Sequence, residues 1–116
     1  MNLSTAIREG AKKRRAYTGG YFGYVYNEIG SCALGAAMDT VFFQEIGAEE
    51  FPSFGLLGGA VSARIQLFEK CGIDTEIMII GPNGPAEPLG DVITELNDEY
   101  QWGREAIADW LESVGL

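Results

Sequence analysis

The chain contains no histidine. Histidine is the commonest general base near neutral pH and the commonest metal ligand, so neither role can be filled in the usual way. Nucleophile pairs of the Ser-His and Cys-His kind cannot form within one such chain. Zinc would have to be held by two cysteines and carboxylates, and no C-x2-C spacing is present. We therefore expect no metal site and no cofactor, and we favour a protein that is not an enzyme.

Cysteines and long apolar runs are also scarce. The two cysteines, Cys32 and Cys71, are too few and too far apart in sequence to predict a disulfide scaffold. No apolar run approaches the ~20 residues that span a bilayer, so we expect no membrane partner. The first residues lack a basic segment followed by an apolar one, which is the pattern of a signal peptide. The simplest interpretation is a cytoplasmic protein.

Basic residues are few and unevenly placed. The chain has 8 Lys and Arg against 17 Asp and Glu, which gives a net charge of −9. Residues 16–116 hold only three of the basic residues against sixteen acidic ones, so phosphate backbones would repel this part of the chain. We expect no nucleic-acid partner. We interpret the basic cluster in the first fifteen residues as a helix end that complements the helix dipole; its members are Arg8, Lys12, Lys13, Arg14 and Arg15. Of these, Arg8, Lys12, Lys13 and Arg15 are expected to stay in solvent.

The size and composition of the chain are those of one folded domain, residues 1–116, with 47% apolar and 22% charged residues. Apolar residues recur at helical spacing in five places. They predict helices over residues 3–15, 32–46, 56–71, 88–100 and 104–114.

Two further segments have the composition of strands. Residues 17–30 are rich in Tyr and Gly and contain an Asn27-Glu28 turn candidate, which predicts a short hairpin or an extended loop. Residues 77–80 are apolar and precede a turn at 81–85, as in a buried strand. We predict that residues 21–26 pair with residues 77–80. The expected fold class is therefore mainly α, a compact bundle of about five helices with a small β-hairpin or a short two- to three-stranded β element.

Several details of the helices can also be predicted. Asn2 or Ser4 is expected to cap the first helix, and Ser31 the second. The second helix begins with small residues over 33–37, so another backbone should pack close to it. The third helix should bury one stripe of apolar side chains at helical spacing, formed by Leu57, Val61, Ile65 and Phe68.

Cys32 is the one candidate for a catalytic residue. A thiol in the first turn of a helix can have its pKa lowered by the helix dipole and become reactive. The competing interpretation is a small hydrophobic residue packed where the second helix meets the hairpin. We favour packing, because the chain offers no histidine to assist the thiol. Cys71 does not lie at the start of a helix, so nothing would lower the pKa of its thiol. We expect its side chain to pack in the protein as well.

Candidate binding residues lie in the tyrosine-rich segment and near the end of the fourth helix. Tyr21, Tyr24 and Tyr26 can supply a large contact area to a partner at little entropic cost, or they can belong to the core. Asn97 and Asp98 offer oxygen ligands, which would suit at most a weak divalent-cation contact. The other carboxylates at helical spacing are interpreted as solvated faces; they are Asp91, Glu95, Glu99, Glu105, Asp109 and Glu112.

Three segments together resemble a family of small bacterial and phage proteins. These are L-S-T-A-I-R-E-G-A at residues 3–11, S-C-A-L-G-A-A at 31–37, and L-N-D at 96–98 followed by W-G-R-E-A-I-A-D-W at 102–110. The resemblance covers the N-terminal third and the C-terminal fifth of the chain. The family has no assigned activity, so the resemblance implies a phage or prophage setting and no mechanism. Its members have Ser or Thr where Gly103 stands, which would complete a helix cap.

Three hypotheses about function follow. We favour a non-enzymatic protein-binding or regulatory module, which includes a phage-derived acidic inhibitor whose carboxylates imitate phosphates. The alternative from another class is an enzyme or redox protein that uses Cys32 as a reactive thiol. The third hypothesis is a structural homo-oligomer.

Overall fold

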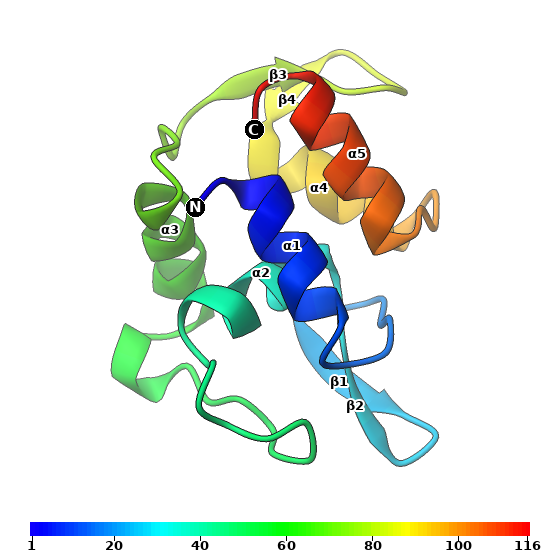
Figure 1. The fold of residues 1–116 in the computed structure, drawn as a ribbon. Helices are drawn as coiled ribbons and strands as arrows, with labels where there is room; N and C mark the ends of the chain where they lie inside the picture. Colours follow the sequence, from blue (N-terminus) through cyan, green and yellow to red (C-terminus); the bar gives the residue numbers. More distant parts are fainter.

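The computed structural model describes all 116 residues and confirms the mainly α fold class (Figure 1). Five α-helices, one short 3-10 helix and two small antiparallel hairpins follow one another along the chain. The elements are α1 (Leu3–Ala11), β1 (Phe22–Val25), β2 (Glu28–Ser31), α2 (Ala33–Val41), η1 (Gly55–Leu57), α3 (Ala60–Lys70), β3 (Met78–Ile80), β4 (Ala86–Pro88), α4 (Leu89–Asp98) and α5 (Arg104–Ser113). No helix has both the length and the apolar character that a membrane crossing requires.

The α1 and α2 helices pack against each other at the centre of the molecule (Figure 1). A Cβ atom added at Gly10 of α1 would overlap with the Ala36 carbonyl of α2, so only glycine fits there. The Thr40 hydroxyl donates a hydrogen bond of 2.6 Å to the Ala6 carbonyl across the same contact. The expectation that the small residues of the second helix admit another backbone is therefore confirmed.

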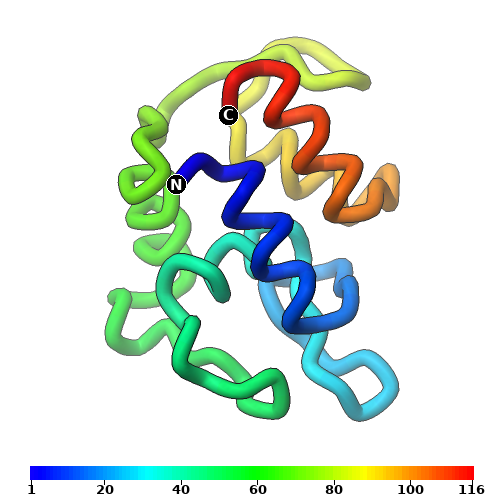
Figure 2. Tube along the Cα trace, in the orientation of Figure 1, coloured from blue at the N-terminus to red at the C-terminus, as the bar shows by residue number.

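The two ends of the chain lie side by side (Figure 2). The Ser4 amide donates to the Leu116 carbonyl at 3.1 Å, which fastens the start of α1 to the end of the chain. The Asn2 side chain caps α1 by accepting a hydrogen bond of 2.9 Å from the Thr5 amide, as predicted. Helix α5 lies beside α1, and 21 buried apolar residues form one core cluster.

The predicted pairing of residues 21–26 with residues 77–80 is wrong. The β1 strand pairs with β2, and β3 pairs with β4 across the turn at 81–85. Each strand finds its partner locally, because a short turn closes a hairpin at far lower entropic cost than a long-range pairing. The two hairpins lie at opposite ends of the molecule (Figure 1). The β3 strand is also not buried, since Met78 and Ile80 are 57% and 72% exposed.

The first hairpin turns one residue earlier than predicted. Tyr26 and Asn27 occupy the turn with φ of 50° and 68°, and Glu28 already belongs to β2. Two-residue hairpin turns favour positive φ at both central positions, because this matches the twist of the strands. Asn adopts positive φ more readily than most residues, so this turn, which contains no glycine, is formed by Tyr26 and Asn27.

Three predicted helices are shorter than expected. Helix α1 ends at Ala11 and α2 at Val41, and the predicted third helix divides into η1 and α3. Gly58 and Gly59 separate these two elements with φ of 79° and 103°, a conformation that no regular helix accommodates.

The predicted buried stripe of the third helix is confirmed at Phe68 and wrong at Val61 and Ile65. Val61 and Ile65 are exposed, and the residues of α3 that are buried are Ala63, Leu67 and Phe68. The helix carries two apolar stripes. The inward one contains the small Ala63, which lets α3 approach its neighbours closely. The helical spacing of apolar residues over 88–100 and 104–114 predicts one buried stripe on each of the last two helices. Both stripes are buried within α4 and α5, with Trp110 half-buried, whereas Tyr100 and Val114 at the ends are exposed; the buried members are Leu89, Val92, Ile93, Leu96, Ile107 and Leu111.

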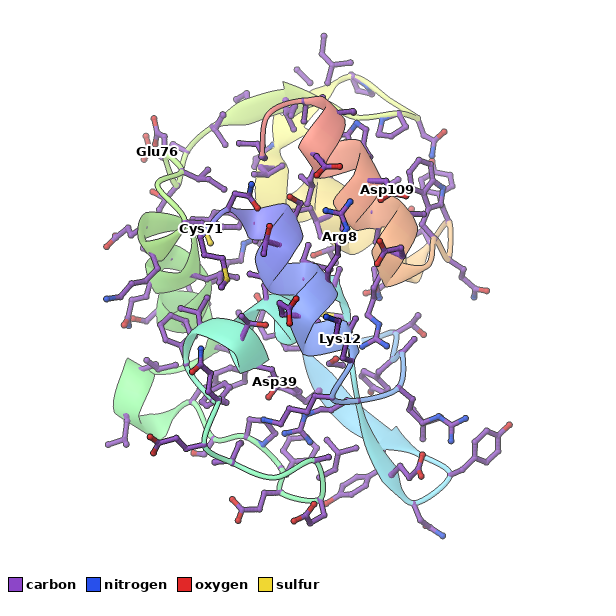
Figure 3. The ribbon with its side chains drawn as sticks, viewed as in Figure 1. Arg8, Lys12, Asp39, Cys71, Glu76 and Asp109 are labelled. Carbon is purple, nitrogen blue, oxygen red and sulfur yellow. The ribbon has the colours of Figure 1, made fainter.

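The prediction that Arg8 stays in solvent is wrong. Its guanidinium reaches three carboxylates of α5, with N–O distances of 2.9, 2.6 and 3.4 Å (Figure 3). These are Glu105, Asp109 and Glu112. The hydrogen bond to Asp109, followed by that to Glu105, raises the pKa of Arg8. Arg8 therefore joins α1 to α5 and offsets one of the three negative charges on this face of α5.

The Gly10→Ala variant should be strongly destabilised. Gly→Ala inside a helix ordinarily stabilises it by about 1 kcal/mol, but here the new methyl group must push α1 away from Ala36. We expect the free energy of unfolding, measured by urea denaturation, to fall by about 3 kcal/mol. Gly84→Ala is the matched control, because a Cβ atom there meets open space. Equal stability of the two variants would contradict the close approach of α1 and α2.

Candidate functional site

Four of the residues singled out in the sequence line one cleft of about 260 Å³. Tyr21 and Cys32 reach it from the hairpin and the start of α2, and Asn97 and Asp98 reach it from the end of α4. The remaining lining residues are Gly19, Gly20, Leu34, Arg64, Ile93 and Thr94. We call this hollow the Cys32 cleft.

The polar groups of Asn97 and Asp98 are engaged inside the protein. The Asn97 amide oxygen accepts a hydrogen bond of 3.1 Å from the Ala33 amide, and its nitrogen donates to the Tyr17 carbonyl at 3.1 Å. Asp98 accepts from the Gly19 amide at 3.2 Å and from the Asn97 side chain at 2.8 Å. These bonds fix the start of α2 and the preceding loop to α4. No three His, Cys, Asp or Glu side chains lie where they could hold a metal ion together.

Cys32 is a buried cap rather than an activated thiol. It is the N-cap residue of α2, the position predicted for Ser31, and its sulfur accepts a hydrogen bond of 3.3 Å from the Gly35 amide. The side chain is buried among the core residues, and this burial raises the pKa of the Cys32 thiol to about 11. The expected lowering by the helix dipole is thus outweighed by the loss of hydration of the thiolate.

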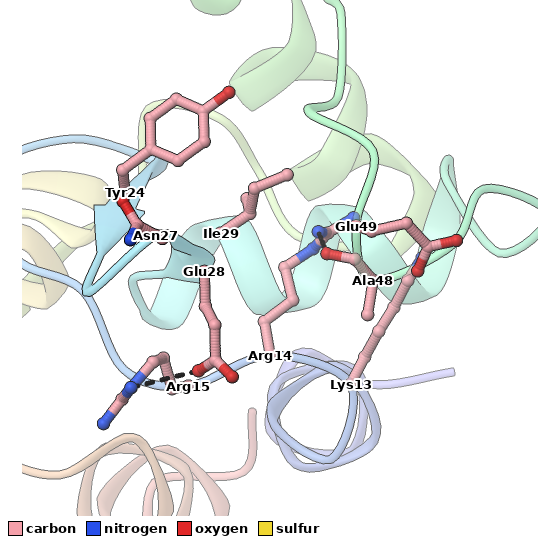
Figure 4. Close-up of a pocket in the computed structure, with 9 residues that line it drawn as sticks. All are labelled: Lys13, Arg14, Arg15, Tyr24, Asn27, Glu28, Ile29, Ala48 and Glu49. Carbon is pink, nitrogen blue, oxygen red and sulfur yellow. Dashed lines mark hydrogen bonds and ion pairs between the residues drawn. The ribbon is translucent and has the colours of Figure 1, made fainter.

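A second hollow, of about 310 Å³, is lined by consecutive basic residues after α1 (Figure 4). Lys13 and Arg14 both pair with Asp39, at 3.1 and 2.7 Å, and Arg15 pairs with Glu28 at 3.0 Å. Every cation in this hollow already has a carboxylate partner, so it offers no free positive charge to an anionic ligand.

Arg14 has a structural task that the sequence did not reveal. Its side chain and that of Asp39 are both fully buried. The guanidinium also donates to the carbonyls of Gly47 and Ala48, at 3.2 and 2.6 Å. Arg14 therefore connects α1, α2 and the segment that follows α2. The sequence assigned this residue only to a basic helix end and gave no sign of burial, because its partners lie far along the chain.

The segment over residues 42–57 shapes the largest hollow of the protein, an open groove of about 680 Å³. Seven of the eleven lining residues are apolar. We call it the apolar groove; it is lined by Val41, Phe42, Phe43, Gln44, Glu45, Ile46, Glu50, Phe51, Ser53, Leu56 and Leu57. Leu56 is fully exposed and Phe51 is 47% exposed, so apolar side chains project at its border.

Aromatic packing holds the 42–57 segment in place, since its one regular element is the short η1 helix. The Phe54 ring packs against Tyr21, Phe22 and Phe43, with centroid distances of 5.8, 6.0 and 6.0 Å. Such pairs add to the burial of the rings themselves. Together with Arg14 they fix the segment against the first hairpin and α2, so the groove exists before any partner binds.

The three candidate tyrosines do not form one surface. Tyr21 lines the Cys32 cleft, whereas Tyr24 lines the basic hollow with its ring 5.4 Å from Phe51, which borders the apolar groove. Tyr26 occupies the hairpin turn under the Arg15 guanidinium, at 5.3 Å. Only Tyr24 can therefore contribute to the apolar groove.

The apolar groove was missed in the sequence, although a signal was present. Residues 42–57 contain four of the six phenylalanines of the chain and no Lys or Arg. Their spacing follows neither helix nor strand, so no periodicity marks them as a surface. An aperiodic cluster of aromatic residues between two helices was the available clue.

Comparisons of the chain with protein-family models, with curated proteins and with solved structures give no match. The resemblance to a family of bacterial and phage proteins therefore stays a prediction.

Asp39→Asn should destabilise the protein far more than the loss of an exposed carboxylate. The substitution leaves the buried Arg14 guanidinium without a charged partner, which typically costs about 3–5 kcal/mol. Asp91→Asn is the matched control, since its pair with Arg64 is partly exposed and should contribute less than about 1 kcal/mol. Urea denaturation measures both. Similar losses in the two variants would show that the buried pair has no special role.

Cys32 should react slowly with iodoacetamide in the folded protein. At pH 8 a thiol with a pKa of about 11 has roughly a hundredfold less thiolate than one at the ordinary value of 9.0. The measurement uses the Cys71→Ser variant, so that Cys32 is the one thiol present, and compares folded with urea-unfolded protein between pH 7 and 10. Equal rates at neutral pH would support a reactive thiol instead.

Proposed function

We propose that this protein is a non-enzymatic binding module of the cytoplasm that engages a protein partner through the apolar groove. The observation that carries the proposal is the groove itself, a preformed hollow of about 680 Å³ with Leu56 and Phe51 exposed at its border. Aromatic residues are enriched in protein–protein interfaces.

The open shape of the groove favours a protein over a small molecule. Sites for small ligands enclose most of the ligand and place a few polar groups around it. Here apolar side chains project outward, and a partner can insert its own side chains between them. The groove is held by buried contacts of Arg14 and Phe54, so little ordering has to occur on binding.

Imitation of nucleic acid by the helix carboxylates is a weaker version of the proposal. The three carboxylates of α5 share the Arg8 guanidinium, which offsets one of their charges and turns them toward α1 rather than leaving them as an independent row. An enzyme that uses Cys32 is disfavoured by the burial and raised pKa of its thiol. If the resemblance to phage proteins holds, a host regulatory protein is the partner to seek first.

The test is capture of a partner by immobilised protein, with variants of the groove. Wild-type protein and the double variant Leu56→Ser/Phe51→Ser are incubated with bacterial lysate, and the captured protein is then purified and titrated. We expect the double variant to bind it at least about tenfold more weakly, because each side chain is an apolar anchor. Both residues are exposed, so folding should persist, which circular dichroism checks.

Ile80→Ser is the matched control, since Ile80 is equally apolar and 72% exposed but lies on the hairpin at the opposite end of the molecule (Figure 1). It should bind as the wild type does. Unchanged binding by the double variant, or equal weakening by the control, would overturn the proposal that the groove is the binding surface.

A further inference from the structure

The apolar groove is bordered by acidic side chains and by no basic one. Glu45 and Glu50 line it. Neither of them pairs with a Lys or Arg, although seven of the seventeen acidic residues do. An apolar surface with unpaired carboxylates beside it is complementary to a ligand that is apolar and positively charged.

The chain has almost no cation of its own left to neutralise these carboxylates. Six of its eight basic residues are in ion pairs. Arg104 donates to Ser31 and to the carbonyls of Ala11 and Arg14, and Lys70 is the last residue of α3. Positive charge at the groove therefore has to come from the partner. For the same reason a second copy of this acidic chain is a poor occupant.

The backbone around the groove selects the form of the partner segment. Addition of a partner strand requires a free sheet edge, and none of the lining residues belongs to a strand. An amphipathic helix needs no backbone partner, because its hydrogen bonds are internal. It presents apolar side chains at i, i+3, i+4 and i+7, flanked by polar positions that can carry Lys or Arg.

We infer that the apolar groove receives a short amphipathic helix of the partner, with an apolar face and basic residues beside it. Its apolar side chains lie against Phe51 and Leu56, and its cations reach Glu45 and Glu50. The inference rests on the proposed function and adds the chemistry of the partner to it.

The test uses synthetic fluorescent peptides as probes. One peptide has Leu at i, i+3, i+4 and i+7 and Lys elsewhere; a second replaces every Lys by Glu; a third scrambles the first. Fluorescence anisotropy should show that the Leu/Lys peptide binds, and that the Leu/Glu and scrambled peptides bind at least about tenfold more weakly. Raising the salt from about 0.05 to 0.5 M should weaken binding of the Leu/Lys peptide.

Protein variants locate the charge effect. Glu45→Gln/Glu50→Gln should weaken binding of the Leu/Lys peptide by about fivefold or more. Glu69→Gln/Glu76→Gln changes the net charge equally, at two unpaired carboxylates on and after α3, and should bind as the wild type does. Equal loss in both pairs, or equal affinity for the Leu/Lys and Leu/Glu peptides, would overturn the inference of a basic partner.

The two levels of the proposal can fail separately. If the Leu/Lys and Leu/Glu peptides both bind, and Leu56→Ser/Phe51→Ser abolishes binding of both, the groove is confirmed as a binding surface. The inference that the partner is basic is then overturned. If that variant leaves peptide binding and partner capture unchanged, the groove itself is overturned. Light scattering of the wild type and this variant identifies a second copy as the occupant if only the wild type dimerises, which also overturns the inference.

Discussion

The close approach of α1 and α2 is the constraint on which the rest of the structure depends. Gly10 lies directly against the Ala36 carbonyl, and Thr40 bonds to the Ala6 carbonyl across the same contact. At this separation the residues after α1 arrive beside the last turn of α2, which brings Arg14 to Asp39 inside the protein. A buried guanidinium needs a carboxylate and further acceptors to offset its lost hydration. The carbonyls of Gly47 and Ala48 supply them.

The position of the 42–57 segment follows from this buried pair. Two of its carbonyls accept hydrogen bonds from Arg14, and its aromatic rings pack against the first hairpin. These two sets of contacts fix a segment that has almost no regular secondary structure. Its remaining apolar side chains cannot also reach the core. Phe51 and Leu56 therefore stay at the surface, and the apolar groove is the result.

The distribution of bonded polar groups separates the groove from the other hollows. Every buried side-chain nitrogen and oxygen has a hydrogen-bond partner, and the polar groups of the Cys32 cleft are used to join α2 to α4. In the basic hollow Lys13 and Arg14 share Asp39, Arg15 pairs with Glu28, and Glu49 also lines the site, so its three cations face three carboxylates. The apolar groove instead leaves apolar side chains exposed beside hydrated carboxylates that pair with no Lys or Arg. This contrast makes the apolar groove the strongest site in the protein.

The sequence by itself determined the mainly α class, the stripes of α4 and α5, the Asn2 cap and the close packing around α2, because these follow from local spacing and side-chain size. Tertiary structure decided the pairing of the strands, the inward face of α3 and the start of α2 at Cys32 rather than Ser31. It also decided which charges are free: Arg14 and Asp39 lie 25 residues apart in the chain, and nothing local marks them as partners. Most of all it decided the groove, since four phenylalanines without periodicity form a surface only when Arg14 and the hairpin hold their backbone.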